Sequence, residues 1–119
     1  MAQDDTSQAE RTVRNAPDRH RFEVLVGDDV AGFTEYIDEG SQRIFFHTEV
    51  DDRFAGQGLA SVLVTAALNE TRSDGKRIVP ICPYVASYLK KHNDFADIAD
   101  EVTPDAMRAV KAFKKASSA

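Results

Sequence analysis

From residue 21 onward the chain alternates apolar and polar side chains with a period of two. Phe22, Val24 and Val26 alternate along residues 21–26, and Gly27 followed by two aspartates supplies a turn. Residues 30–37 and 43–50 repeat the pattern, with a second turn at residues 38–41. The pattern therefore predicts a meander of three antiparallel strands.

The apolar spacing then changes to that of a helix. From residue 59 to 67, apolar residues recur three or four positions apart, which is typical of one buried helix face, and Gly75 marks the end of the helix. Residues 77–82 are short, apolar and β-branched, as in a buried strand. Residues 83–92 predict a short helix with Pro83 in its first turn, and Phe95 and Ile98 predict a last extended piece.

A final helix is predicted from Thr103 and Pro104, which fit the N-cap and first-turn positions. Its apolar stripe of Met107, Val110 and Phe113 is expected to pack on the sheet. The order of elements predicts an α+β fold in which the helix after residue 58 connects two parallel strands.

Length and composition predict one domain. The chain has 119 residues, close to the common size of a single domain. Residues 1–20 hold almost no large apolar side chain and are expected to be a flexible tail, leaving residues 21–119 as the domain. No apolar run reaches the roughly 20 residues of a membrane span, and one cysteine fits a reducing compartment, so we expect a cytoplasmic protein with no membrane partner.

The formal net charge is −5, and the acidic excess lies between residues 22 and 104. Such a balance repels nucleic acid and attracts amines. We therefore expect no nucleic-acid partner. The final helix either packs on the sheet or contributes a minor dimer contact, so the expected state is a monomer or weak dimer.

Candidate chemistry lies at residues 50–60, between a predicted strand and a predicted helix. A helix N-terminus offers unpaired backbone N–H groups to an anion, and Gly56 and Gly58 let an anion approach the backbone. Arg53 adds a cation. No Gly-Lys-Ser/Thr follows, and Ser61 stands where a dinucleotide-binding loop needs a third glycine. On this physics alone, a plain tight turn remains an equal alternative.

The pattern Arg53-x-x-Gly56-x-Gly58-Leu59-Ala60 resembles motif A of the GNAT superfamily of acyl-CoA-dependent N-acetyltransferases. The segments 47–50, 80–86 and 88–92 resemble the small, single-domain members. The resemblance covers residues 22–98 and implies a compact GNAT-like fold: an antiparallel meander, then helix-strand-helix with a splayed pair of parallel strands. This sequence is shorter than the family's common pattern and leaves no room between Val26 and Val30 for the helical pair that usually covers the acceptor. An open cleft is therefore expected.

The resemblance implies acetyl-CoA as the cofactor. The pyrophosphate would lie at Arg53, Gly56, Gln57, Gly58, Leu59 and Ala60. The pantetheine would enter the gap beside the strand that ends near residue 50, and the acetyl group would lie at Cys82. The remaining expected cofactor contacts are Thr48, Val50, Tyr88 and Lys91.

Two residues on the third strand are candidate bases for the incoming amine. His47 and Glu49 are two positions apart and should share one face, which we expect to include Phe45, with Phe46 and Thr48 on the other. Histidine titrates near neutrality, whereas a glutamate base needs an apolar surrounding. The alternative is an ordinary solvated strand face.

Cys82 and Tyr88 are the other candidate catalytic residues. A cysteine at the acetyl position permits attack on the thioester, although a cysteine in an apolar strand is more often packing, and direct transfer is the superfamily's default. Lys90 stands where the superfamily commonly has the tyrosine that protonates the leaving thiolate, which leaves Tyr88 or Tyr84 for that role. Lys91 either contacts a phosphate or is solvated. No metal site is expected.

The sequence thus predicts an N-acetyltransferase that moves an acetyl group from acetyl-CoA to an amine, such as a protein lysine or N-terminus. A non-catalytic acyl-CoA sensor or interaction module shares the turn but needs none of the catalytic side chains. A plain structural domain, with Gly56 and Gly58 serving only a turn, predicts no binding of acetyl-CoA.

Overall fold

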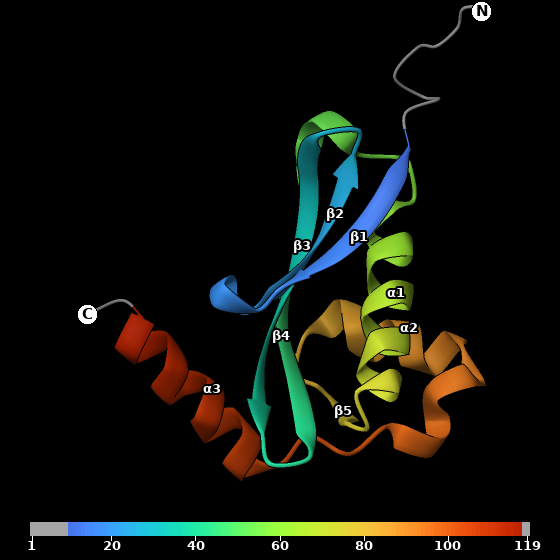
Figure 1. The fold of residues 1–119 in the computed structure, drawn as a ribbon. Coiled ribbons are helices and arrows are strands. Elements are labelled where there is room, and N and C mark those ends of the chain that lie inside the picture. The colour runs from blue at the N-terminus through green and yellow to red at the C-terminus, as the bar shows by residue number, and fades with distance from the viewer. Residues whose placement is uncertain (1–9, 118–119) are drawn as a thin grey trace, which may run out of the picture.

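The computed structural model describes residues 10–117, which form a five-stranded sheet with helices on both faces (Figure 1). Strands β1 to β4 are antiparallel neighbours in sequence order, and β5 joins β4 in parallel. In chain order the elements are β1 (Arg11–Ala16), η2 (Pro17–Arg19), β2 (Arg21–Val26), β3 (Asp29–Glu39), β4 (Gln42–Val50), η3 (Asp52–Phe54), α1 (Leu59–Ser73), β5 (Arg77–Pro80), α2 (Pro83–Lys91), η4 (Asn93–Ile98) and α3 (Pro104–Ser117).

The predicted meander, the helix after residue 58 and the parallel crossover are confirmed. Two local predictions are wrong. Strand β5 ends at Pro80, so Cys82 lies at the N-cap of α2 instead of in the strand. Phe95 and Ile98 lie in the 3-10 helix η4, where Phe95 packs its ring near Tyr88 instead of extending the sheet.

The expected flexible tail is wrong for residues 11–20, because β1 pairs along its full length with β2. Val13 packs against the core, and the Asn15 side chain accepts a hydrogen bond of 2.7 Å from the Tyr36 hydroxyl. These partners are distant in sequence, so composition alone does not reveal them. Residues 1–9 of the expected tail lie outside the described residues.

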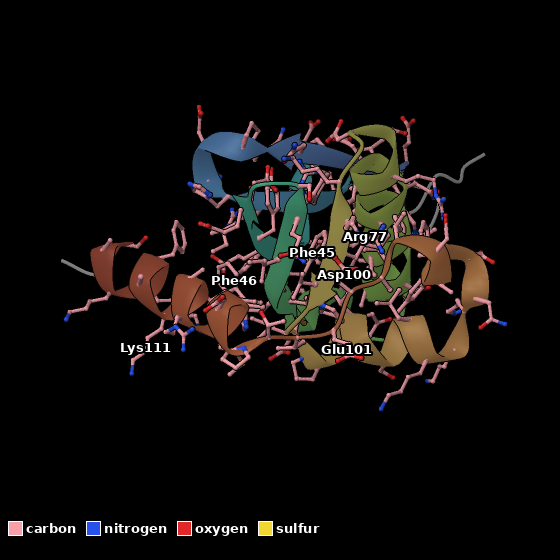
Figure 2. The ribbon with its side chains drawn as sticks, turned by 90° about the horizontal axis from the view of Figure 1, so that it is seen from below. Phe45, Phe46, Arg77, Asp100, Glu101 and Lys111 are labelled. Carbon is pink, nitrogen blue, oxygen red and sulfur yellow. The ribbon has the colours of Figure 1, made fainter. Side chains whose placement is uncertain are left out.

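Two apolar cores lie on opposite faces of the sheet. Helix α1 covers one face, and its Leu63 and Leu68 pack with Phe22 and Phe45. Helix α3 covers the lower end of the other face, where Val110 and Phe113 pack near Phe46 (Figure 1). The view from below in Figure 2 shows Phe46 on the α3 side of β4, with Phe45 nearer α1.

Helix α3 begins where the sequence predicts, and the Thr103 hydroxyl accepts from the Ala106 N–H at 3.1 Å. Its inward stripe differs from the prediction. Ala106 and Val110 are buried, whereas Met107 is 53% exposed. The helix is rotated so that Met107 flanks the contact with the sheet.

A β-bulge in β4 overturns the predicted grouping of its side chains. His47 faces Glu35 in the register and Phe45 faces Tyr36, so Phe46 has no partner on β3. An extra residue reverses the alternation beyond it. His47 and Glu49 do share a face, as predicted, but Phe45 lies on the opposite face together with Thr48, which contacts the buried Cys82.

The β2–β3 connection consists of residues 27–28 alone, so no helical pair follows β2. The sheet face opposite α1 is therefore covered only where α3 lies. The segment between η4 and α3 is held to the sheet by hydrogen bonds. Arg77 donates to Asp100 at 2.9 Å (Figure 2), and Asp100 also accepts from Gln42. This contact anchors the segment that leads into α3.

Glu23 is a fully buried carboxylate that joins the first three elements. It accepts from Arg14 and Arg21 at 2.9 and 2.7 Å and pairs with Arg19 at 3.2 Å. Burial alone would raise the pKa of the Glu23 carboxyl, but the hydrogen bonds from Arg21 and Arg14 outweigh it and hold the pKa below its ordinary value. The ionised form of the Glu23 carboxyl is therefore favoured more strongly in the folded chain than in the unfolded one.

We expect Glu23→Gln to lower the free energy of unfolding at pH 7 by about 2 kcal/mol, because a neutral amide cannot balance the arginines. The carboxylate's contribution is complete above its unfolded pKa and is lost as the pH falls through the lower folded value. The deficit of the variant should therefore shrink below about pH 4. Urea unfolding at pH 7 and pH 3 measures both quantities. The exposed Glu39→Gln is the control, and an equal deficit at both pH values contradicts this account.

Candidate active site

Strands β4 and β5 separate at one level of the sheet. They pair in parallel from Gln42 and Arg77 up to Phe45 and Pro80. The Cys82 N–H then donates to the Phe45 carbonyl at 2.9 Å, and α2 turns away while β4 continues to Val50. The upper part of β4 therefore presents an edge without a parallel partner on this side.

The turn that follows β4 ends at an uncapped helix. Gly56 and Gly58 adopt left-handed φ values of +83° and +72°, and open space lies where a side chain on either would project. Gly58 is the N-cap of α1, and no side chain caps the first turn or places an acid in it. Its free N–H groups and the helix dipole favour an anion at this point. Leu59 anchors this end in the core.

Arg53 is not a free cation. Its guanidinium donates to both oxygens of Asp51, at 3.2 and 3.3 Å, and its backbone N–H donates to the same carboxylate at 2.9 Å. The backbone and side-chain hydrogen bonds from Arg53 lower the pKa of Asp51, and the side chain of Arg53 remains 68% exposed. An anion at the turn would compete with Asp51 for this guanidinium.

A recess of about 210 Å³ lies between α1 and α2. It is lined by Ser61, Tyr84, Ser87, Tyr88, Lys91 and His92. The sequence prediction had singled out Tyr88 and Lys91, and the structure brings both to this recess beside the first turn of α1. The Tyr88 hydroxyl is bound to the Thr65 hydroxyl at 2.8 Å. Either hydroxyl can donate in this bond.

Cys82 ends a chain of three buried or half-buried polar groups. The Thr48 hydroxyl lies 3.1 Å from the Cys82 sulfur and 2.9 Å from the Thr34 hydroxyl. Cys82 is 2% exposed and Thr34 is fully buried. The predicted residues Thr48 and Cys82 are thus in contact, where β4 parts from β5.

His47 and Glu49 lie on the opposite face of β4. The His47 ring nitrogen is 3.1 Å from a Glu49 carboxylate oxygen, and the two side chains are 48% and 60% exposed. Phe33 on β3 flanks the His47 ring, with centroids 6.0 Å apart. Glu49 also lines a hollow of about 530 Å³ together with Val50 and Asp52.

Comparison with known families gives this geometry a context. The model of the GCN5-related N-acetyltransferase family matches residues 21–98. The chain belongs to this family. Members of this GNAT family transfer acetyl groups and use acetyl-CoA as donor, and the match spans β2 to η4, including the turn, the parting strands and α2.

A solved structure supports the GNAT fold. The solution structure of a GCN5-like candidate N-acetyltransferase from Staphylococcus aureus superposes with a TM-score of 0.59 at 21% identity, covering 78% of this chain and 91% of that one. At this identity the likeness concerns the fold, and it confirms the α+β GNAT-like architecture. No curated protein sequence matches the chain.

The residues of the candidate site that sequence reasoning missed are polar side chains that contact or adjoin the predicted ones. Thr34 and Thr65 hold Thr48 and Tyr88, and Ser61 and Ser87 line the recess. The register of β3 against β4, with the bulge included, pairs Thr34 with Thr48 and would have revealed this contact.

Within residues 10–117, no three His, Cys or acidic side chains are grouped to hold a metal ion, and no helix has the length and apolar character of a membrane span.

We expect Thr48→Val to lower the free energy of unfolding by about 1–2 kcal/mol, because the buried Thr34 hydroxyl loses this hydrogen bond. Replacing both residues, Thr34→Val with Thr48→Val, should cost less than the sum of the two single changes, since both polar groups are then absent. Urea unfolding of the four proteins in this cycle measures the coupling. Strict additivity would show that the hydroxyl pair does not act as a unit.

Proposed function

We propose that this protein transfers an acetyl group from acetyl-CoA to a primary amine carried by a polypeptide. The observation that carries the proposal is the uncapped N-terminus of α1, which follows the strand that parts from β5 after the turn at residues 51–58. An anion-binding helix end beside an unpaired strand edge suits an elongated donor with a phosphate portion and an amide-bearing arm. Family membership supports acetyl-CoA as that donor.

The residues present fit acetyl-CoA. The backbone N–H groups of Gln57, Leu59 and Ala60 would hold the pyrophosphate, and the bare Cα atoms of Gly56 and Gly58 leave the space it needs. Lys91 would meet a phosphate at the recess between α1 and α2. Thr48 and Val50 would bond the amide-bearing arm along the edge of β4. Acetyl-CoA supplies the acetyl group as an activated thioester.

The two faces of β4 would serve different reactants. Thr48 and Cys82 lie on the α1 side, where the donor would lie, and His47 and Glu49 lie on the open side, where an amine would arrive. One of the pair, Glu49 or His47, would take the proton of the incoming ammonium, directly or through water. The 3.1 Å contact between them lets either residue orient the other.

Direct transfer is the route we propose. The Cys82 thiol is nearly buried and bound to Thr48, which suits a group that positions the thioester. Two groups could protonate the leaving thiolate: the Tyr88 hydroxyl, bound to Thr65, and the Cys82 and Thr48 pair. In this route the ammonium proton leaves through His47 or Glu49, and the thiolate regains a proton from the other face.

We expect Gly56→Asp to abolish saturable binding of acetyl-CoA, because it puts a carboxylate where the pyrophosphate would lie. Calorimetric titration of the pure protein measures this. Gly40→Asp is the matched control, since Gly40 also has a positive φ, of +58°, with open space around it, but lies in the β3–β4 hairpin. Equal affinity of both variants and the wild type for acetyl-CoA would refute binding of the pyrophosphate at this turn.

We expect Glu49→Gln or His47→Gln to reduce kcat by on the order of 100-fold while acetyl-CoA affinity stays within about twofold, because the base acts only on the acceptor. Initial rates with saturating acetyl-CoA and a lysine peptide give kcat. The alternative, a non-catalytic acyl-CoA sensor, predicts saturable binding without any amine-dependent release of CoA by the wild type. Unchanged kcat in both variants would remove these residues from the mechanism.

A further inference from the structure

Two separate concavities are associated with the sheet face opposite α1, one beside Phe33 and Glu49 and one along α3. The first is the hollow of about 530 Å³ that Glu49 and Asp52 line, and Phe33 also contributes to it. The Arg21 guanidinium lies 4.5 Å from the centre of the Phe33 ring, but this cation is already paired with Glu23. The exposed carboxylates of Glu49 and Asp52 therefore give the rim of this hollow an acidic character.

The second concavity is a groove along α3 of about 250 Å³. Ile81, Met107 and Val110 form its apolar walls, and Lys111 and Lys114 line it with positive charge. Met107 is 53% exposed, although a methionine at this position would be expected to pack on the sheet. Figure 2 shows Lys111 projecting from the outer side of α3. Across the described part of the chain, Lys111 has no acidic partner.

The groove adjoins the candidate catalytic positions through chain neighbours. Ile81 directly precedes Cys82, and Lys114 lies 5.5 Å from the ring of Phe46, which directly precedes His47. Phe46 faces α3, and because of the bulge His47 lies on the same face of the sheet. The candidate base His47 is thus near residues of both concavities: Phe33 of the acidic hollow flanks its ring, and Phe46, which precedes it, contacts Lys114 of the groove.

We propose that the acceptor docks across this face as a polypeptide, with its amine toward the acidic hollow and a neighbouring apolar and acidic segment in the α3 groove. This rests on the proposed function. Charge complementarity selects the occupant: apolar walls with a lysine rim fit an apolar side chain flanked by carboxylates. A second copy joined through α3 by a two-fold axis would bring Lys111 and Lys114 toward their own equivalents. The α3 helix thus takes over acceptor binding in a chain that lacks a helical pair after β2.

The test uses blocked peptides that each contain one lysine, with Leu-Glu-Glu, Ser-Glu-Glu or Leu-Arg-Arg placed before or after it. Arginine supplies positive charge without adding a second acceptor amine. The expected kcat/KM for the Leu-Glu-Glu peptide, in at least one placement, is tenfold or more above that for Leu-Arg-Arg, and the Ser-Glu-Glu peptide lies between them. Methylamine serves as the acceptor that cannot reach the groove.

Lys111→Glu should lower the preference for Leu-Glu-Glu over Leu-Arg-Arg by at least fivefold and leave methylamine turnover unchanged. Arg11→Glu makes the same charge change at the start of β1, far from α3, and should leave the preference intact (Figure 1). Met107→Ser should reduce the advantage of leucine over serine.

Equal kcat/KM for all the peptides with active enzyme, or an unchanged preference in Lys111→Glu, overturns the docking proposal while the proposed function stands. Sedimentation distinguishes a second copy: a dimer that Lys111→Glu dissociates, with peptide preference unchanged, also overturns it. Failure to acetylate methylamine and every peptide, despite binding of acetyl-CoA, refutes the proposed function itself, and the docking proposal with it.

Discussion

The separation of β4 from β5 is the constraint on which the rest of the structure depends. Parallel pairing ends at Phe45 and Pro80, and the Cys82 N–H makes the last bond to β4. Proline at position 80 cannot donate an N–H, and Pro83 starts a helix whose direction differs from that of the strand. The edge of β4 beyond Phe45 has no parallel partner, and α1 begins after the turn at residues 51–58 that follows this edge.

The β4 bulge adds a second consequence to this separation. Without the extra residue, His47 would lie on the α1 face, against Thr34 and Cys82, and Thr48 would face solvent. The bulge instead places the Thr48 hydroxyl on the buried side with Cys82, and the imidazole and carboxylate of His47 and Glu49 on the open side. In the proposed function, one strand would then meet the donor on its buried face and the acceptor on its open face.

Charge is distributed in the same divided manner. Arg53 is held by Asp51, and Arg14, Arg19 and Arg21 are held by Glu23, so these cations lock elements in place. The anion site proposed at α1 would therefore depend on backbone N–H groups more than on a side chain. On α3, Lys111 has no acidic partner among the described residues, and the docking proposal assigns it to the choice of acceptor.

Much of the fold was predictable because the spacing of apolar residues along the chain indicates which side chains are buried. The strands of the meander, the helix after Gly58 and the cap at Thr103 follow from local patterns, and the resemblance of the turn indicated the family. What failed depends on distant partners. Strand β1 is ordered by β2, and neither the bulge at Phe46 nor the rotation that exposes Met107 leaves a local signal.

The candidate site, like the fold, was predictable from the sequence only in part. The sequence placed Gly56, Gly58, Tyr88 and Lys91 in segments that the fold does bring together around the start of α1. It did not reveal that Asp51 holds Arg53, because a hydrogen bond between residues two positions apart depends on the turn's geometry. The pairing of Thr34 with Thr48 likewise required the register of β3 against β4.

The central claim is that acetyl-CoA lies across the start of α1 and along the free edge of β4. Titration of isotope-labelled protein with acetyl-CoA, followed through backbone amide resonances, tests it most directly. The account predicts saturable shifts concentrated at residues 54–61, 48–50 and 82–91, with little change in β1 and α3. Shifts confined to the open sheet face around Phe33 and Asp52, or no shifts at millimolar ligand, would contradict it.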